Sequence, residues 1–318
     1  MRIFLAGGAG AIGRPFISQA ASRGHEIVAT TTSKSRTALL ASLGATPVVL
    51  DGLDASAVGE AVARARPDAI VHQMTALAGR PDMRHFDRWF AQTNRLRTEG
   101  TRHLLAAAEA TGVKLFVAQS YAGWPSGHDP AVMTTETVPL DDHPAPSQRE
   151  TQAAISFLER AVTTAPLTGI VLRYGSLYGL GATDGMVDMV RKRMVPIIGG
   201  GTGVTSWLHV DDAAGAALAA VEKPTAGLFN IVDDDPAPVA EWLPHMARVV
   251  GAKPPLSIPT WLGRLLAGDA AVRIMAEASG ASNAKARRTF DWTPQWPSWR
   301  EGFRHALVTR GGNVGRAA

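Results

Sequence analysis

Six short apolar segments alternate with longer helical stretches over the first 174 residues, and this alternation strongly limits the folds open to the chain. The expected strands are residues 2–7, 25–31, 46–51, 68–74, 114–120 and 168–174. A clear helical pattern, for example, covers 93–112. Strands that alternate with helices pair in parallel through right-handed crossovers. The pattern predicts an α/β fold with a Rossmann-like doubly wound parallel sheet, covered on both faces because its strands are apolar throughout.

Composition excludes several classes of function. The 318 residues carry 32 Lys and Arg against 28 Asp and Glu, a net charge of only +4, which does not indicate a nucleic-acid-binding protein. The short basic run Arg191–Arg193 is expected to be a solvated helix face. Cysteine is absent, which rules out disulfides, thiolate catalysis and Cys-based zinc sites. We find no secretory signal and no apolar run near the roughly 18 residues that span a membrane, and we expect a cytoplasmic protein.

A glycine-rich turn follows the first strand and opens a helix. Its sequence, Gly7-Gly8-Ala9-Gly10-Ala11-Ile12-Gly13, contains three glycines spaced by three residues. Glycines let a backbone turn tightly and approach a pyrophosphate, and the helix N-terminus adds free N–H groups and partial positive charge. The turn therefore predicts a dinucleotide site.

The glycine spacing resembles that of the extended short-chain dehydrogenases/reductases, the NAD-dependent epimerase/dehydratase family, and further segments resemble it in the same order. They are Asp51-Gly52-Leu53-Asp54, Gln73-Met74-Thr75-Ala76, Asn94, Leu172–Gly179, Trp207–Asp212, Asn283–Ala286 and Trp292–Pro294. The resemblance implies a cofactor site built from several loops, a small-molecule substrate and a homodimer formed through helices at about 93–111 and 148–164. The candidate cofactor-binding residues are Gly7, Gly10, Ala11, Ile12, Gly13, Thr32, Ser33, Lys34, Asp51, Gly52, Leu53, Gln73, Met74, Thr75, Asn94, Gln119, Gln152, Tyr174, Gly175 and Leu177.

The end of the second strand bears on the choice between NAD and NADP. A free ribose usually meets an Asp or Glu there, but residues 29–36, ATTTSKSR, contain no carboxylate. Thr32, Ser33 and Lys34 can instead donate to a 2′-phosphate, with Arg36 nearby. We expect NADP rather than NAD.

The catalytic acid of the superfamily that the chain resembles is missing from this sequence. Its enzymes use a Tyr-x-x-x-Lys pair, in which lysine lowers the tyrosine pKa and tyrosine shuttles the proton that accompanies hydride transfer. Gln148 and Gln152 align with that pair. The three tyrosines, Tyr121, Tyr174 and Tyr178, have no lysine four residues on, and no lysine lies between residues 114 and 192.

Three interpretations remain open. A relocated acid can serve an oxidoreductase of a small, apolar substrate, with Tyr121, Tyr174 or the adjacent Ser120 as the catalytic group. Alternatively, the acceptor needs no strong acid, as with an iminium or quinone-like substrate. Finally, the protein can bind the dinucleotide without redox turnover, as a sensor, a regulator or a non-redox enzyme.

The chain is expected to divide into two parts. The Rossmann domain comprises 1–174, to which 203–228 returns, and a smaller substrate-binding subdomain comprises 175–202 and 229–318, packed over the sheet's C-terminal edge. Residues 176–185 and 196–204 are expected to be glycine-rich loops. The expected cleft lining is Trp124, Met133, Met186, Met189 and Trp207.

Two His/Asp groups, His128-Asp129 and Asp141-Asp142-His143, are expected to be solvated loop and no metal site. Asp211 and Asp212 are expected to cap a helix over 212–222.

Overall fold

The computed structural model describes residues 1–77, 79–123, 132–141 and 143–308. Its centre is a seven-stranded sheet in the order β11-β6-β5-β4-β1-β2-β3, and every neighbouring pair is parallel. The strands are β1 (Arg2–Ala6), β2 (Glu26–Thr31), β3 (Ala45–Val49), β4 (Ala69–His72), β5 (Leu115–Tyr121), β6 (Thr168–Tyr174) and β11 (Gly227–Ile231). The expected fold class and all six expected strands are confirmed, and β11 is a seventh strand at the edge that the sequence pattern missed.

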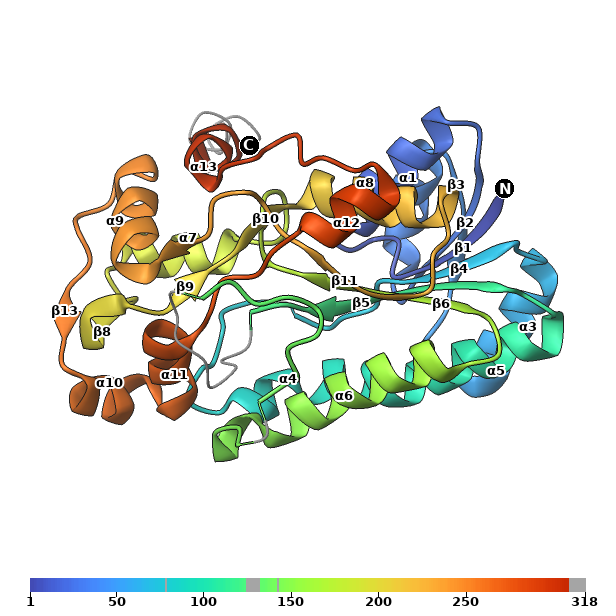
Figure 1. Ribbon diagram of the computed structural model, residues 1–318. Coiled ribbons are helices and arrows are strands. Elements are labelled where there is room, and N and C mark those ends of the chain that lie inside the picture. Colours follow the sequence, from blue (N-terminus) through green and yellow to red (C-terminus); the bar gives the residue numbers. More distant parts are fainter. Residues whose placement is uncertain (78, 124–131, 142, 309–318) are drawn as a thin grey trace.

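Helices cover both faces of this sheet (Figure 1). The α-helices are α1 (Gly13–Ser22), α2 (Thr37–Ser42), α3 (Ala55–Ala65), α4 (Phe86–Arg95), α5 (Thr101–Thr111), α6 (Arg149–Thr164), α7 (Asp184–Arg191), α8 (Val210–Glu222), α9 (Val239–Val249), α10 (Thr260–Ala267), α11 (Asp269–Glu277), α12 (Ala284–Phe290) and α13 (Trp299–Val308). Helices α1, α8 and α12 lie above the sheet in that view, and α3, α5 and α6 lie below it. Each layer encloses its own apolar core.

The chain reverses its direction of travel across the sheet at β1. Strand β1 pairs with β2 on one side, where Ile3 lies opposite Ile27, and with β4 on the other, where Ile3 lies opposite Ala69. In open α/β sheets, ligands bind outside the carboxyl ends of the strands at such a switch point. The topology thus places the glycine turn where a dinucleotide is expected.

The expected helix over 93–112 is confirmed as part of a longer helical segment. Helix α4 begins at Phe86, a π-helical stretch occupies Leu96–Gly100, and α5 continues to Thr111. Because π-helical turns insert an extra residue, they often occur at functional sites. Here the π-helical stretch begins two residues after Asn94.

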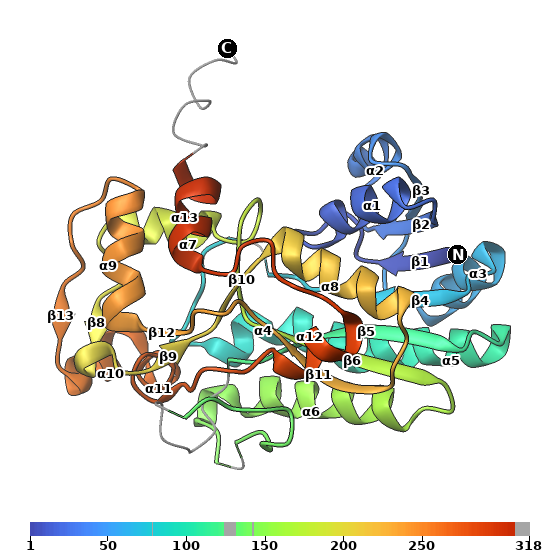
Figure 2. The same cartoon turned by 45° about the horizontal axis from the view of Figure 1, so that its top comes forward.

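The remainder of the chain forms a second cluster beside the sheet (Figure 2). Its short strands are β7 (Ser176–Tyr178), β8 (Ile197–Ile198), β9 (Val204–Thr205), β10 (Trp207–His209), β12 (Ala237–Pro238) and β13 (Ser257–Ile258). The expectation of plain loops at 176–185 and 196–204 is wrong, because β7, the start of α7, β8 and β9 lie there. The core of this cluster is aromatic, since Trp207 contacts Tyr178, Trp242 and Phe303 edge to face.

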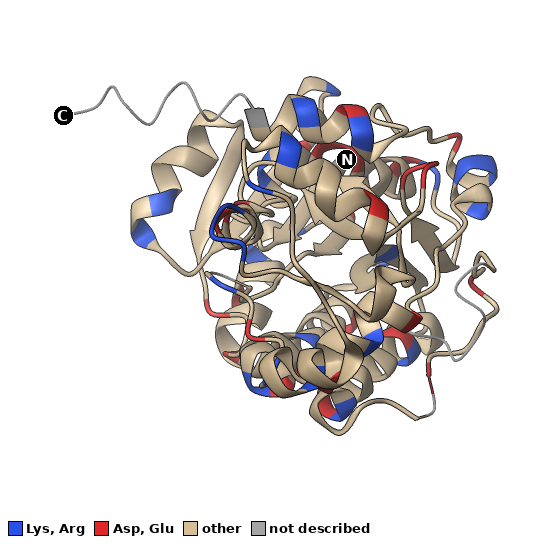
Figure 3. Cartoon of the chain, turned by 90° about the vertical axis from the view of Figure 1, so that its left-hand side faces the viewer, with Lys and Arg blue, Asp and Glu red and all other residues tan. Residues whose placement is uncertain are grey.

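Charged residues of both signs alternate over the surface rather than forming one charged face (Figure 3). Arg191, Lys192 and Arg193 are all exposed at the end of α7, as expected. In the described part of the chain, no helix combines the length and the apolar character needed to cross a membrane.

Candidate functional site

The glycine turn between β1 and α1 has no room for a side chain at Gly7, Gly8 or Gly13. Gly7 has φ 96°, and a Cβ there would lie 2.7 Å from the carbonyl oxygen of Gln73. A Cβ on Gly13 would lie 2.4 Å from the carbonyl oxygen of Gly7. The Gly7 N–H donates to Thr30 Oγ1 at 3.0 Å, so the turn is pressed between β2 and the segment after β4. The turn leads directly into the N-terminus of α1, where the partial positive charge of the helix dipole favours a phosphate.

The loops after β2 and β3 border the same edge of the sheet. Thr32 and Lys34 are exposed and Ser33 is half-buried. Asp51 Oδ1 accepts a hydrogen bond from the Leu53 N–H at 3.0 Å. A Cβ on Gly52 would lie 2.4 Å from Met74 Sδ, so this loop packs directly on the segment after β4.

Six further predicted residues continue this edge. Ile12 is 4% exposed and caps α1, with the half-buried Ala11 before it. Thr75 is exposed beyond Met74, Gln119 is half-buried near the end of β5, and Leu177 is half-buried in β7. Gly175 packs so tightly that a Cβ would lie 2.6 Å from the Ser206 carbonyl oxygen.

Three buried amides lie beyond these loops, and each uses its NH₂ group within the protein. Gln73 Nε2 donates to the Tyr174 hydroxyl at 3.0 Å. Asn94 Nδ2 donates to Thr151 Oγ1 at 3.0 Å, and Gln152 Nε2 donates to a main-chain carbonyl of the loop before α6. Among the described residues, the carbonyl oxygens of all three amides have no hydrogen-bond partner.

A fourth amide has an unpaired donor instead of an unpaired acceptor. Gln148 is 1% exposed, and its Nε2 has no partner among the described residues. Leaving buried polar atoms unpaired costs roughly 1–3 kcal/mol each, so such atoms usually await a ligand or water. A nicotinamide riboside offers amide N–H and ribose O–H donors. Three unpaired acceptors and one unpaired donor fit that group.

Asp87 fixes the start of α6 and was missed by sequence reasoning. Its Oδ1 accepts from the Thr151 N–H at 2.9 Å and from Thr151 Oγ1 at 2.7 Å, and its Oδ2 accepts from the Glu150 N–H at 3.1 Å. A carboxylate at a helix N-terminus stabilises the free N–H groups there. Because the capping residue lies on another helix, 63 residues away in the sequence, no local motif predicts it.

Tyr121 is the predicted hydroxyl with most access to the cleft. It is half-buried, packs with Phe86 and Ile155, and its hydroxyl lies 3.4 Å from Ser176 Oγ. Burial raises its pKa. Tyr174 is only 1% exposed, its hydroxyl accepts from Gln73, and burial raises its pKa far above the ordinary value. Tyr174 is therefore better suited to orienting the Gln73 amide than to supplying a proton.

Ser120 lies in a different environment. Its hydroxyl donates to Glu159 Oε1 at 2.7 Å, and Glu159 also accepts from Arg173 at 2.7 and 2.6 Å. Arg97 adds a second buried guanidinium, and desolvation lowers its pKa to about 10. Consecutive strand residues point to opposite faces, so Ser120 lies away from Tyr121. This geometry favours a structural role for Ser120.

The expected cleft lining needs correction. Trp207 is 3% exposed in the aromatic core, and Met186 and Met189 pack against the same cluster. Met133 is 42% exposed, and Trp124 lies outside the described residues. An apolar wall beside Tyr121 is instead formed by side chains from α4 and the segment before it, from α6, from α11 and from the loop before α6. Its members are Met83, Phe86, Phe90, Leu140, Ile155, Ala270 and Ile274.

The expectation of a solvated loop at 141–143 is wrong for Asp141. Asp141 is 8% exposed and pairs with Arg273 at 2.6 Å. His128, Asp129 and Asp142 lie outside the described residues. No three His, Asp or Glu side chains gather as a metal site in the part that the structure describes.

The expected aspartate cap is also wrong. Helix α8 begins at Val210, and the side chain of His209, the residue before it, accepts from the Asp211 N–H. Asp212 accepts from the N–H groups of Gln295 and Trp296 at 2.6 and 3.0 Å. Asp212 therefore holds the segment at Gln295 and Trp296 against α8.

The sequence model of the NAD dependent epimerase/dehydratase family matches residues 3–231. The chain belongs to this family. A curated relative from Streptomyces sp., named 3-diazoavenalumate denitrifying reductase, is 44% identical over 307 residues, covering 95% of this chain and 99% of the relative. The resemblance inferred from the motifs is confirmed.

Solved structures share the family fold over nearly their whole length. UDP-glucose 4-epimerase from Thermus thermophilus, in complex with NAD, has a TM-score of 0.76 at 24% identity, covering 99% of this chain and 100% of that one. The human epimerase family protein SDR39U1, with NADPH, has a TM-score of 0.71 at 20% identity, covering 96% and 99%. As a family member, the protein is an NAD(P)-binding enzyme of the oxidoreductase or epimerase type.

Proposed function

We propose that the protein is an NADP-dependent reductase whose acceptor takes hydride without needing a proton in the same step, and that this acceptor is an aromatic diazonium or related diazo acid. The observation that carries the proposal is the pair Gln148 and Gln152. Both are buried at the start of α6, where the family has its acid and its lysine, and neither can gain or lose a proton near neutral pH.

The charge of the acceptor decides whether a proton is needed. A ketone that accepts hydride becomes an alkoxide, which must be protonated, and positioned acids contribute roughly 10²–10⁴-fold to such steps. An aryldiazonium that accepts hydride at its terminal nitrogen becomes a neutral diazene, which can lose N₂ and leave a C–H bond. A bound nicotinamide supplies the hydride. Gln148 then needs only to orient the acceptor through its free N–H.

Loss of the lysine also suits a cationic acceptor. Two positive charges about 5 Å apart repel by about 3 kcal/mol at an effective dielectric constant near 20. A neutral Gln152 removes that repulsion and keeps a hydrogen-bonding group for the ribose. The family's lysine would disfavour the substrate that we propose.

The relative from Streptomyces supports this assignment, because its name describes reduction of a diazo compound with loss of nitrogen. The apolar wall next to Tyr121, which includes Phe86 and Phe90, suits an aromatic ring. Tyr121 remains the group for the alternative in which a relocated acid serves a small apolar carbonyl substrate.

The preference for NADP rests on the segment after β2. It presents Thr32, Ser33 and Lys34 at the surface or close to it, with Arg36 exposed and no carboxylate between 29 and 36. An acidic residue would repel the 2′-phosphate, whereas these side chains can donate to it.

The same proposal assigns the cofactor to 1–174 with 203–228, and the substrate to 175–202 and 229–318. It also includes a homodimer formed through α5 and α6 with the end of α4. A monomer in light scattering would remove the dimer from the proposal.

The test follows NADPH oxidation by the purified protein with 4-carboxybenzenediazonium, and product formation by mass spectrometry. 4-Carboxybenzaldehyde is the matched carbonyl, and reactions without protein correct for direct reduction. We expect the diazonium to turn over at least 100-fold faster than the aldehyde, with little change in kcat between pH 6 and 8. Faster aldehyde reduction would favour a relocated acid, and tight NADPH binding without turnover of either compound would favour a non-catalytic protein.

A further inference from the structure

The loop between β5 and α6 is attached to the C-terminal part of the chain. Thr134 is held from two sides, because its N–H and Oγ1 donate to the Gly280 carbonyl at 2.7 and 2.9 Å, and its own carbonyl accepts from the Ser282 N–H at 2.9 Å. A second attachment lies at Asp141 and His143, close to the start of α6. Both attachments join described residues of this loop to residues that follow them by more than 100 positions.

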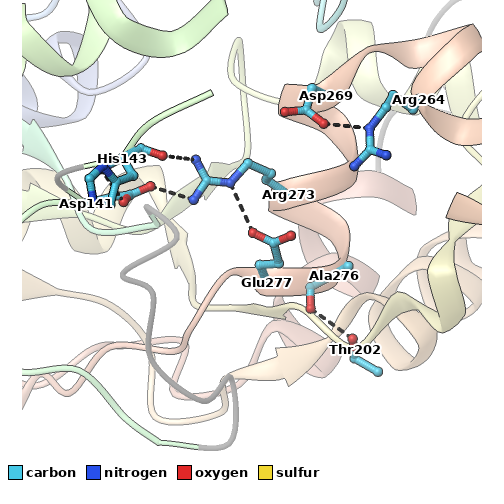
Figure 4. Close-up of polar contacts among 8 residues, drawn as sticks. All are labelled: Asp141, His143, Thr202, Arg264, Asp269, Arg273, Ala276 and Glu277. Carbon is cyan, nitrogen blue, oxygen red and sulfur yellow. Dashed lines mark hydrogen bonds and ion pairs between the residues drawn. The ribbon is translucent and has the colours of Figure 1, made fainter. Parts of the chain in front are cut away.

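Arg273 of α11 makes the second attachment (Figure 4). Its Nη2 donates to Asp141 Oδ2 at 2.6 Å, its Nη1 donates to the His143 carbonyl at 2.9 Å, and its Nε donates to Glu277 Oε2 at 3.0 Å. The side chains of Arg273 and Asp141 are 15% and 7% exposed. Ion pairs and charge-assisted hydrogen bonds that are mostly buried are stronger and less screened than surface pairs.

The main chain of the same aspartate contacts the amide of α6. The Asp141 carbonyl accepts the hydrogen bond from Gln152 Nε2. Because a carbonyl can only accept, this contact fixes which end of the amide is NH₂ and which is oxygen. Gln152 Oε1 is thereby turned to the opposite side, where it is buried and has no partner among the described residues.

We propose that Arg273 is a positioning residue of the reductase site: by holding Asp141, it orients the Gln152 amide so that its oxygen accepts hydrogen bonds from the ribose hydroxyls of the cofactor. This inference rests on the proposed function. Without the guanidinium, the Asp141 carboxylate is left buried without its ion pair, retaining only the hydrogen bond from the His143 N–H at 2.9 Å, and Asp141 no longer holds its carbonyl against Gln152. The amide then rotates freely, and ordering it on binding costs affinity.

The first measurement is NADPH binding by the substrate-free protein. Arg273→Gln is expected to raise the Kd for NADPH about 10-fold, and Asp141→Asn, which keeps the carbonyl but loses the ion pair, should do the same. The matched control is Arg264→Gln. Arg264 of α10 pairs with Asp269, the first residue of α11, at 2.8 Å, but its side chain is 58% exposed and the pair lies apart from Asp141 (Figure 4). The control should leave the Kd unchanged.

A double-mutant cycle separates positioning from a general loss of structure. If Arg273 acts through Gln152, then Arg273→Gln should change the Kd by less than about 2-fold in a Gln152→Ala background. Additive effects of the two substitutions, or an unchanged Kd in Arg273→Gln, would overturn the proposal. Thermal melts of each variant without cofactor establish that it is folded. If one variant unfolds, Arg273→Lys is measured in its place, because it retains the charge and should recover part of the NADPH affinity.

These outcomes do not depend on the acceptor. A protein that binds NADPH with the expected cycle but does not reduce the diazonium compound would refute the proposed reaction and keep the role of Arg273. A wild-type protein that does not bind NADPH would refute both.

Discussion

The two ends of the proposed cofactor site differ in the residues that build them. At the proposed phosphate end, Gly7 and Gly13 leave no room for a Cβ, the turn leads into α1, and the Asp51 loop packs beside it. At the proposed nicotinamide end, Gln148 and Gln152 stand at the start of α6, where the resemblance places the family's acid and lysine. On this proposal, cofactor binding and proton transfer are separable in this fold, because each depends on its own elements.

The largest effect is expected at the phosphate end. In Gly13→Ala, a Cβ 2.4 Å from the Gly7 carbonyl forces the turn apart. NADPH affinity should fall at least 100-fold, about 2.7 kcal/mol, in a binding titration. The matched control is Gly59→Ala in α3, where a Cβ meets nothing within 4 Å and φ is ordinary. Normal affinity in a folded Gly13→Ala protein would show that the turn does not hold the phosphates.

The second expected effect lies at the nicotinamide end. Gln148→Tyr combined with Gln152→Lys restores the family's pair and should raise carbonyl reduction about 10-fold or more, since a positioned acid then becomes available. The new ammonium should lower diazonium turnover by up to about 100-fold, through a repulsion of about 3 kcal/mol. Rates with both acceptors are compared in one folded variant. No gain with carbonyls would mean that the surrounding cleft has diverged too.

A smaller effect is expected at the adenosine side of the phosphate end. Lys34→Glu places a carboxylate where we expect the 2′-phosphate, so the Kd for NADPH should rise about 10-fold, about 1.4 kcal/mol, while that for NADH changes little. Lys253→Glu makes the same charge change at an exposed site elsewhere and serves as the control. Equal changes for both cofactors would contradict the preference for NADP.

The smallest effect is expected for Tyr121→Phe. Burial raises the pKa of this tyrosine by more than the hydrogen bond to Ser176 lowers it, so the hydroxyl stays protonated at neutral pH. If the acceptor needs no acid, kcat should fall less than 3-fold and its pH profile should remain flat. A loss of 100-fold or more, within the range of general acid catalysis, would make Tyr121 the relocated acid and remove the contrast between the two ends.

Local patterns predicted the sheet well because its strands are short apolar runs that bury both faces. Strand β11 was missed for a physical reason. It lies at the edge, and of its residues Gly227 and Leu228 are only half-buried, so its pattern is weaker. Loop predictions at 176–185 and 196–204 failed because glycines there allow close packing. The Cβ of a residue at 201 would lie 2.7 Å from Ile197 Cγ2, for example.

The site was predictable where one segment builds it and unpredictable where distant segments meet. The glycine turn and the amide pair on α6 could be read from spacing alone. The Asp87 cap of α6 and the pairing of Asp141 with Arg273 join residues 63 to 132 positions apart, and no period or motif encodes such contacts. For the same reason the prediction that Trp207 lines the cleft failed, because Trp207 packs in a core that includes residues as distant as Leu307.

The separation of 132 residues between Asp141 and Arg273 also sets an order of assembly. Chains grow from the N-terminus at roughly 5–20 residues per second, and early segments can fold first. The phosphate turn needs nothing beyond the segment after β4, so its contacts can form while most of the chain is still unmade. The amide of Gln152 acquires its full support only after α11 has left the ribosome. On the proposed assignment, a nascent chain therefore completes its phosphate turn before its ribose contact, and the reactive end is the last part of the site to form.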